Sequence, residues 1–524
     1  MSVRFAIRRS AWLRSTSAAV TAAALLTSAA ANSAARLADA ARDRDFATVK
    51  VLLADTDDID AYGSDGTQAL LWVIRVQDTE LARLMLDAGA DPNLANRYDL
   101  TPLALAVELG DVDTTELLLD AGADATVPDA AGEPLLFAAI RNGDVTIARA
   151  LLGAGVEVDA VDASYHQTAL MVAARERQPE IARLLIEAGA DVSRQTPAEG
   201  TPSHRLPADN AGSKGVGIVR GGWPEHGMRA PIAGAKTPLL YAARDGSPEI
   251  ASMFIEAGAD IEQADANGTT PLLVAIINDN MVTARALIEA GANVNAVDWY
   301  GQTPLWAAVD VRNLDVPGPT RENGVDRAAA LEVIELLLAQ GADVNARTKE
   351  YPPERRWITT LGSLAWVDVT GQTPFFRAAL AGDVTVMRLL LEHGADPNVH
   401  TYTGTSPLMA AAGVNWVFNQ TFDEGPEALL DAVKLSFELG NDVNQVNHMG
   451  VGAVHGAANR GSDDIIKFLY EHGARLDIAD QAGRTPMNWA EGVFLATHAP
   501  EAKPSTMTLI AELLSQDEGT AADR

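Results

Sequence analysis

Residues 270–302 read TPLLVAIINDNMVTARALIEAGANVNAVDWYGQ, and Thr303 then begins the same phrase again with TPLWAAV. A threonine hydroxyl can cap the first free N–H groups of a helix, and a proline at the first helical position already has the required φ. The Leu and Ala residues that follow form a narrow apolar face, and a short Asn/Asp turn separates them from a second amphipathic helix. Gly291 lies where a left-handed helix end is expected. The stretch therefore predicts a helix–turn–helix unit closed by a polar loop.

This unit recurs along the chain with a period of 33 residues. Thr237, Thr270 and Thr303 are 33 residues apart, as are Thr373 and Ser406. The glycine phrase recurs too, for example as AGADPN at 88–93 and HGADPN at 393–398. A fixed period of this length is the signature of stacked repeats rather than of several separate domains. From the first unit near residue 35 to the last opening at Thr485, the register accommodates about twelve units.

The capped helix, the glycine stop and the period together resemble those of ankyrin repeats, and the order of the insertions is similar to that of secreted bacterial ankyrin-repeat proteins with long inserts. The resemblance implies an all-α ankyrin-repeat solenoid with β-hairpin loops over residues 34–515. It also implies a concave surface, built from hairpin tips and first helices, that binds another protein. We expect a monomer, and we expect residues 516–524 to be a disordered tail.

Residues 1–33 have the composition of a secretory signal peptide. They contain four arginines and no acid, then an apolar stretch at 18–26, then small residues suited to cleavage after Ala31 or Ser33. The alternative is a retained anchor, but nine apolar residues are far fewer than the roughly 20 that span a bilayer. We therefore expect a periplasmic or secreted protein with no membrane span after signal removal.

Composition excludes several classes of site. The chain has 524 residues, a formal charge of −31 and no cysteine. Without cysteine there are no disulfides, thiolate zinc sites or iron–sulfur clusters. The acidic balance argues against binding nucleic acid, which requires a basic surface. We predict no cofactor and no metal.

Four insertions interrupt the period. Their tryptophans, Trp223, Trp357, Trp366 and Trp416, indicate packed loops rather than flexible linkers. By register, two extend hairpins and two separate the helices of one unit, so that units seven to nine would enclose a groove walled on both sides. The insertions are residues 194–236, 311–326, 346–369 and 413–426.

Aromatic residues at hairpin tips are candidate anchors for a protein partner. Tyr98, Tyr165 and His448 occupy such places. Two alternatives stay open: each tip aromatic packs on the adjacent tip, and the inserts cover the scaffold instead of forming a site. The proposed partner-binding set is Trp299, Tyr300, Arg355, Arg356, Trp357, Tyr402 and Trp416.

No catalytic motif is present in the sequence. G-x-S-x-G, H-E-x-x-H and the P-loop are all absent. His204 and His226 share the 194–236 insert but form only a weak metal-binding pattern. We therefore predict a non-enzymatic interaction scaffold with no catalytic residue. The alternatives are a ligand-binding or enzymatic protein that uses the 194–236 insert, and a secreted effector directed at a host.

Overall fold

The computed structural model describes residues 36–54, 58–198, 204–205, 228–229, 233–314, 324–349, 370–416, 421–422, 424–493 and 501–522, with side chains as far as 516. The chain divides into two compact units, residues 1–194 and 195–524. The expected signal peptide, residues 1–33, lies outside the described residues, as does most of the inserts at 194–236 and 346–369.

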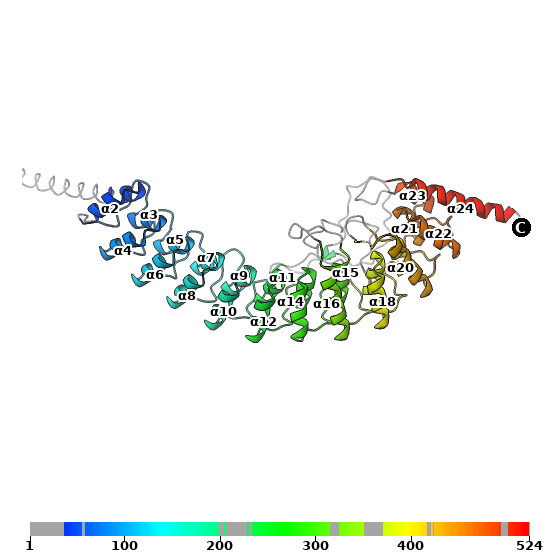
Figure 1. The fold of residues 1–524 in the computed structure, drawn as a ribbon, viewed down its shortest axis with the longest axis horizontal. Coiled ribbons are helices and arrows are strands. Elements are labelled where there is room, and N and C mark those ends of the chain that lie inside the picture. The colour runs from blue at the N-terminus through cyan, green and yellow to red at the C-terminus, as the bar shows by residue number, and fades with distance from the viewer. Residues whose placement is uncertain are drawn as a thin grey trace, which may run out of the picture. The chain divides into compact units, whose positions relative to one another are not determined.

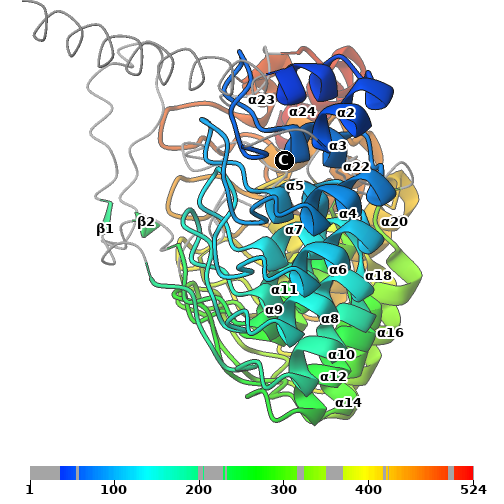
Figure 2. The same cartoon turned by 90° about the vertical axis from the view of Figure 1, so that its left-hand side faces the viewer.

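The first unit is a two-layer stack of helix pairs (Figure 1). The first helices α3, α5, α7 and α9 pack on one another in one row, and the second helices α4, α6, α8 and α10 form a parallel row beside it (Figure 2). The pairs are residues 36–42 with α2 (Phe46–Leu53), α3 (Ala69–Arg75) with α4 (Thr79–Asp87), α5 (Pro102–Glu108) with α6 (Val112–Asp120), α7 (Leu135–Asn142) with α8 (Val145–Gly153), and α9 (Ala169–Arg175) with α10 (Pro179–Glu187).

The second unit has the same internal arrangement of helix pairs. Its short strands β1 (His204–Arg205) and β2 (Met228–Arg229) pair antiparallel within the 194–236 insert. Its helix pairs are α11 (Pro238–Asp245) with α12 (Pro248–Glu256), α13 (Pro271–Ile277) with α14 (Met281–Glu289), α15 (Pro304–Arg312) with α16 (Arg327–Ala339), α17 (Pro374–Ala381) with α18 (Val384–Glu392), α19 (Pro407–Ala412) with α20 (Pro426–Glu438), α21 (Ala453–Arg460) with α22 (Asp463–Glu471), and α23 (Pro486–Gly492) with α24 (Pro504–Ala522). The described part of the chain thus holds twelve helix pairs, numbered here as repeats 1 to 12, in agreement with the predicted all-α solenoid.

The helix starts follow from the recurring Thr-Pro phrase. The hydroxyl of Thr101 accepts the N–H of Ala104 at 3.2 Å, and the hydroxyl of Thr373 accepts the N–H of Phe376 at 3.2 Å. Proline follows each of these caps at the first helical position. Many second helices begin instead at an aspartate, such as Asp111, whose carboxylate accepts the N–H of Thr114. Where such a cap is present, it satisfies a backbone donor that would otherwise be left unpaired.

The C-terminal end differs from the sequence-based expectation. Helix α24 extends to Ala522, whereas a disordered tail was predicted from residue 516. No proline interrupts the chain after Pro504, so the helical backbone continues. Within the described residues, no helix has both the length and the apolar composition needed to cross a bilayer.

Candidate protein-binding surface

An Asx turn shapes the hairpin before many of the first helices. In repeat 3, Asn96 Oδ1 accepts the N–H groups of Tyr98 (2.9 Å) and Leu100 (3.2 Å). In repeat 8, Asp298 Oδ1 accepts those of Tyr300 (2.9 Å) and Gln302 (2.8 Å) in the same pattern. The turn fixes the direction of the residues between it and the helix cap. It therefore sets which tip side chains can meet a partner.

The pKa of Asp298 is raised to about 7, mainly by burial and to a smaller extent by the nearby charge of Asp265, against the lowering effect of the backbone N–H groups that donate to its carboxylate. Asp298 is 4 % exposed. Asn96, in the equivalent turn, makes the same bonds with an uncharged amide. The Asp298 turn is therefore sensitive to pH near neutrality.

In several repeats, the residue four positions before the cap of the first helix connects adjacent hairpins. The N–H of Trp299 donates to the carbonyl of Asn267 at 3.1 Å, and that of Tyr402 donates to the carbonyl of Thr370 at 3.1 Å. Their side chains lie over the preceding tip glycine: a Cβ placed on Gly268 would be 3.1 Å from Cδ1 of Trp299. Trp299 is half-buried in this position. Its packing matches the alternative in which a tip aromatic rests on the adjacent tip.

The prediction that Tyr300 is an exposed contact residue is wrong, because its side chain is completely buried. The next hairpin lies directly against it, and the N–H of Lys349 donates to the Tyr300 carbonyl at 2.8 Å. Tyr402 fits the prediction better, since it is 39 % exposed, with the Arg347 guanidinium 4.4 Å from its ring centre.

Trp416 lies near the start of the 413–426 insert and packs on the helices beneath it. It is half-buried and packs against Phe376, Leu380 and Ala410, with the Arg460 guanidinium 4.8 Å from its ring centre. This arrangement matches the alternative in which an insert covers the scaffold. The remaining predicted contacts, Arg355, Arg356 and Trp357, lie outside the described residues.

Among the described residues, the most exposed tip aromatics belong to the first unit. Tyr98 and Tyr165 are 60 % and 70 % exposed, and Tyr62, farther from its helix cap, is 47 % exposed. Tyr98 is supported by its neighbour Arg97, whose guanidinium lies 4.8 Å from the ring centre. Tyr98 and Tyr165 precede their helix caps by three residues, the register at which Tyr300 is buried. Tyrosines of this kind supply contact area with little loss of conformational entropy on binding.

A buried charge cluster lies in repeats 8 and 9, and the sequence analysis did not detect it. Arg377 Nε is 2.6 Å from Asp310 Oδ1, and Arg312 Nε is 2.8 Å from Asp383 Oδ2. All four side chains are at most 9 % exposed. Burial lowers the pKa of Arg377 to about 10. The sequence signal was the arginine within TPFFRAA, where the other repeats place an apolar residue or tyrosine.

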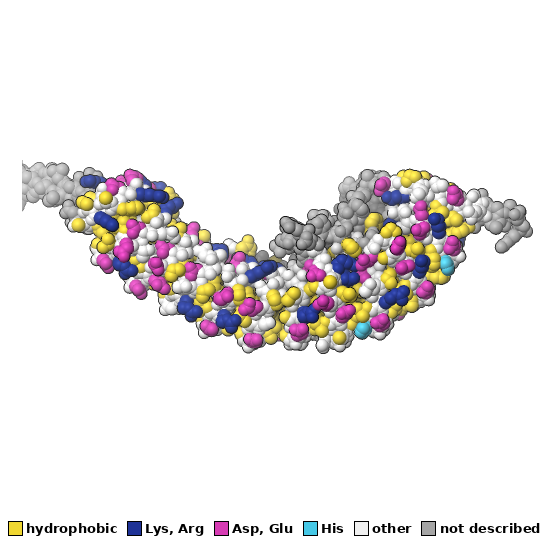
Figure 3. All heavy atoms as spheres, viewed as in Figure 1, with side chains coloured by type: hydrophobic (Ala, Val, Ile, Leu, Met, Phe, Trp, Pro, Cys, Tyr) yellow, Lys and Arg dark blue, Asp and Glu magenta, His cyan; other side chains and the backbone are white. Residues whose placement is uncertain are grey.

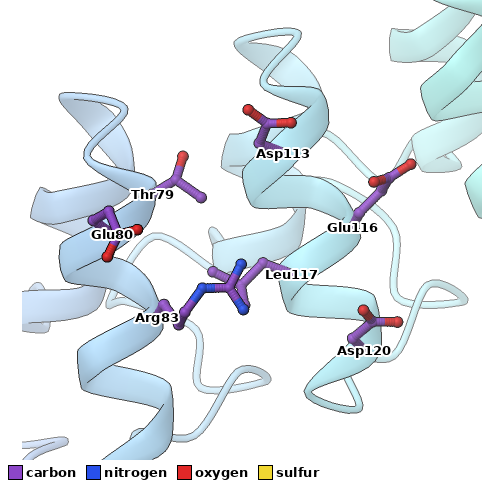
Figure 4. Close-up of a pocket in the computed structure, with 7 residues that line it drawn as sticks. All are labelled: Thr79, Glu80, Arg83, Asp113, Glu116, Leu117 and Asp120. Atoms are coloured by element: carbon purple, nitrogen blue, oxygen red, sulfur yellow. The ribbon is translucent and has the colours of Figure 1, made fainter.

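A hollow of about 360 Å³ lies between α4 and α6 of the first unit (Figure 4). Carboxylates dominate its lining, and Arg83 reaches into it between the two helices. Within the described ranges no group of three His, Asp or Glu side chains is placed to hold a metal ion. On the face drawn in Figure 3, acidic, basic and apolar side chains are interspersed. The hollow is lined by Thr79, Glu80, Arg83, Asp113, Glu116, Leu117 and Asp120.

Comparison with known proteins identifies the class defined by this stack. The family model described as ankyrin repeats (3 copies) matches residues 37–129, 122–196, 234–317 and 327–419, and the single ankyrin repeat model matches residues 300–349. The chain therefore belongs to the ankyrin repeat family, whose members are in general protein–protein interaction modules.

Three curated relatives are similar over parts of the chain. The E3 ubiquitin-protein ligase KEG of Arabidopsis thaliana is 26 % identical over 170 residues, covering 31 % of this chain and 8 % of that protein. The inactive serine/threonine-protein kinase TEX14 of Bos taurus is 38 % identical over 117 residues, covering 20 % of this chain and 8 % of that protein. The cyclin-dependent kinase 4 inhibitor B of Rattus norvegicus is 34 % identical over 114 residues, covering 22 % of this chain and 78 % of the inhibitor.

Among solved structures, the human ASB11 ankyrin repeat domain is similar at 21 % identity. The match covers 53 % of this chain and 98 % of that chain, with a TM-score of 0.37. The chain spans 8 % of the length of the first two relatives, so the similarity covers only a small part of each of those proteins.

Proposed function

We propose that this chain is a non-enzymatic scaffold that captures a protein partner through the hairpin tips of its first unit. The observation that carries the proposal is the exposure of Tyr98 and Tyr165, at 60 % and 70 %, on tips that the Asx turns hold in a fixed direction. Rigid tyrosines that present an apolar ring and a polar end are favoured anchors at protein interfaces. Tyr62 of repeat 2 lies beside this surface, with its hydroxyl donating to the carbonyl of Ala95 at 3.1 Å.

The test is capture by the full chain and by its Tyr98→Ala/Tyr165→Ala variant. Proteins retained by immobilised wild type are identified by mass spectrometry, and the Kd of the purified partner is then measured for each variant. We expect the double variant to bind at least about tenfold more weakly, because tip anchors contribute 1 kcal/mol or more each. Val282→Ala, which removes a 67 % exposed side chain from α14, is the matched control and should bind like wild type.

The predicted contacts of the second unit provide the competing outcome. If Trp299→Ala/Tyr402→Ala abolishes binding while Tyr98→Ala/Tyr165→Ala does not, the partner binds the second unit and the proposal is wrong. If wild type retains a small ligand and no protein, the alternative ligand-binding function is favoured instead.

We further propose that binding takes place in the periplasm or outside the cell. The support is the composition of residues 1–33, which has the order of a secretory signal. Cell fractionation with detection of the mature N-terminus tests this location. A full-length cytosolic protein would contradict it, and recovery from the medium would favour the effector alternative over a periplasmic scaffold.

A further inference from the structure

The segments between the helices of repeats 8 and 10 meet each other. Leu314, just after α15, forms an antiparallel bridge with Thr421, which lies just before α20. The N–H of Phe422 donates to the carbonyl of Asn313 at 3.2 Å. In a repeat stack each unit normally contacts only its immediate neighbours. This contact therefore links two repeats that have a third repeat between them.

Arg327, at the start of α16 in repeat 8, strengthens the same link. Its guanidinium forms an ion pair with Glu424 of repeat 10, and it also lies 4.1 Å from the ring centre of Phe422. Its Nη1 donates to the carbonyl of Arg312 at 2.6 Å, which fixes the side chain against its own repeat. Arginine suits this position because one planar group can serve several partners at once.

Repeat 9, which lies between repeats 8 and 10, forms hydrogen bonds with both of them. The carbonyl of Asn313 that accepts Phe422 also accepts Arg377 Nη2 of α17 at 2.9 Å, and Asn313 is completely buried. One backbone oxygen of repeat 8 therefore accepts hydrogen bonds from both repeat 9 and repeat 10. In addition, the N–H of Glu424 donates to the carbonyl of Ala381 at the end of α17 at 3.3 Å.

We propose that these contacts form a brace that makes repeats 8, 9 and 10 open and bend as one unit. The brace consists of Asn313, Leu314 and Arg327 on one side and Thr421, Phe422 and Glu424 on the other. Because opening any one of the three repeats breaks contacts to the other two, local opening of a single repeat is suppressed. The inference concerns how the second unit moves and does not depend on the binding surface proposed above.

Native-state hydrogen exchange of the full chain tests the brace with the variant Phe422→Ala/Glu424→Gln. Both residues lie outside the helices, Phe422 half-buried and Glu424 exposed, so the repeats should still fold. We expect the slowest amides of α15, α17 and α19 to exchange faster together, by about tenfold. The amides of α23 in repeat 12 should not change. Repeats 8 and 12 are both two repeats away from repeat 10, so α23 is the control for a general effect of distance along the stack.

Two further variants make the outcome decisive. Glu424→Gln alone should produce a smaller change in the same three helices. Arg285→Gln removes an exposed ion pair to Glu332 between the adjacent repeats 7 and 8, and it should leave α19 unchanged. Faster exchange confined to α19, or no change in any helix of the brace variants, would overturn the proposal.

Discussion

Repeats 2–5 and repeats 8–10 are built on the same repeat pattern, but their first helices differ in how completely they are buried. In repeats 2–5 the ends of the first helices reach solvent, as at Arg75, Glu108 and Leu109. In repeats 8–10 every residue of α15, α17 and α19 is buried. The difference teaches that insertions between the helices can turn a surface that is normally open into internal structure. This difference in burial is why we propose the open tips of the first unit as the binding surface.

The largest expected effect comes from the buried ion pair. Arg377→Met should destabilise α17 by about 3–5 kcal/mol, because it leaves the Asp310 carboxylate buried without its partner. Arg141→Met in the first unit should cost less than about 1 kcal/mol, since the Arg141–Glu133 pair is well exposed. Hydrogen exchange at α17 and α7 measures both.

Replacing the whole pair checks that explanation. Arg377→Met/Asp310→Leu should recover most of the lost stability, because an apolar pair can replace a buried ion pair at little cost. If the double variant is as unstable as Arg377→Met, the lost stability comes from packing or from the Asn313 contact instead of the unpaired charge.

Substitution of a tip glycine should give the next largest difference in stability between the two regions. Gly132 and Gly371 both have positive φ, 81° and 78°, and each lies two residues before the N-cap of a first helix. A Cβ on Gly132 would meet nothing within 4 Å, whereas one on Gly371 would lie 2.8 Å from Arg347 Nη2 and 2.9 Å from Tyr402 N. We expect Gly132→Ala to cost about 1 kcal/mol and Gly371→Ala about 2–3 kcal/mol. Thermal unfolding measures both changes in stability. Equal losses of stability in the two variants would show that the tips of the second unit are not packed as described.

A pH dependence should distinguish Asp298 from its counterpart Asn96. The folded-state pKa of Asp298 is raised to about 7, above its ordinary value of 3.8. Between about pH 4 and pH 7 the folded chain therefore holds a proton that the unfolded chain has released, so this contribution to stability falls as pH rises, by at most about 1.4 kcal/mol per pH unit.

Asp298→Asn should remove that slope, making the variant more stable than wild type at pH 8 and about equal to it at pH 4. Urea unfolding followed at the repeat 8 hairpin across this range measures the effect. A variant that is destabilised equally at both pH values would contradict the raised pKa.

The smallest effect should be the same in both regions. Thr101→Ala and Thr373→Ala each remove one N-cap hydrogen bond, at 3.2 Å in both cases, and should each cost about 1 kcal/mol. Hydrogen exchange at α5 and α17 checks this equality. A much larger loss at Thr373 would mean that its cap has a role in the brace as well.

The sequence predicted the repeat because its signals are local. Thr-Pro starts, apolar spacing and the glycine period all act within one unit, and the structure confirms the solenoid that they imply. The exposure of the tip residues was harder to predict. Tyr98 and Tyr300 have equivalent positions in their repeats, but the next hairpin covers only Tyr300.

The pairing within the charge cluster could not be predicted from local pattern. Arg377 and Asp310 are 67 residues apart in the chain, and the 346–369 insert separates them. Only the stacking of α15 on α17 brings them together. An arginine in an apolar helix opening indicates a special environment, but not which acid it meets.

The most direct measurement of the central claim is hydrogen exchange of the full chain with and without its purified partner. If the open tips of the first unit form the binding surface, protection should appear at residues 97–99 and 164–166. The already buried helices α15, α17 and α19 should not change. Protection confined to the second unit, with the tips at Tyr98 and Tyr165 unaffected, would contradict the account.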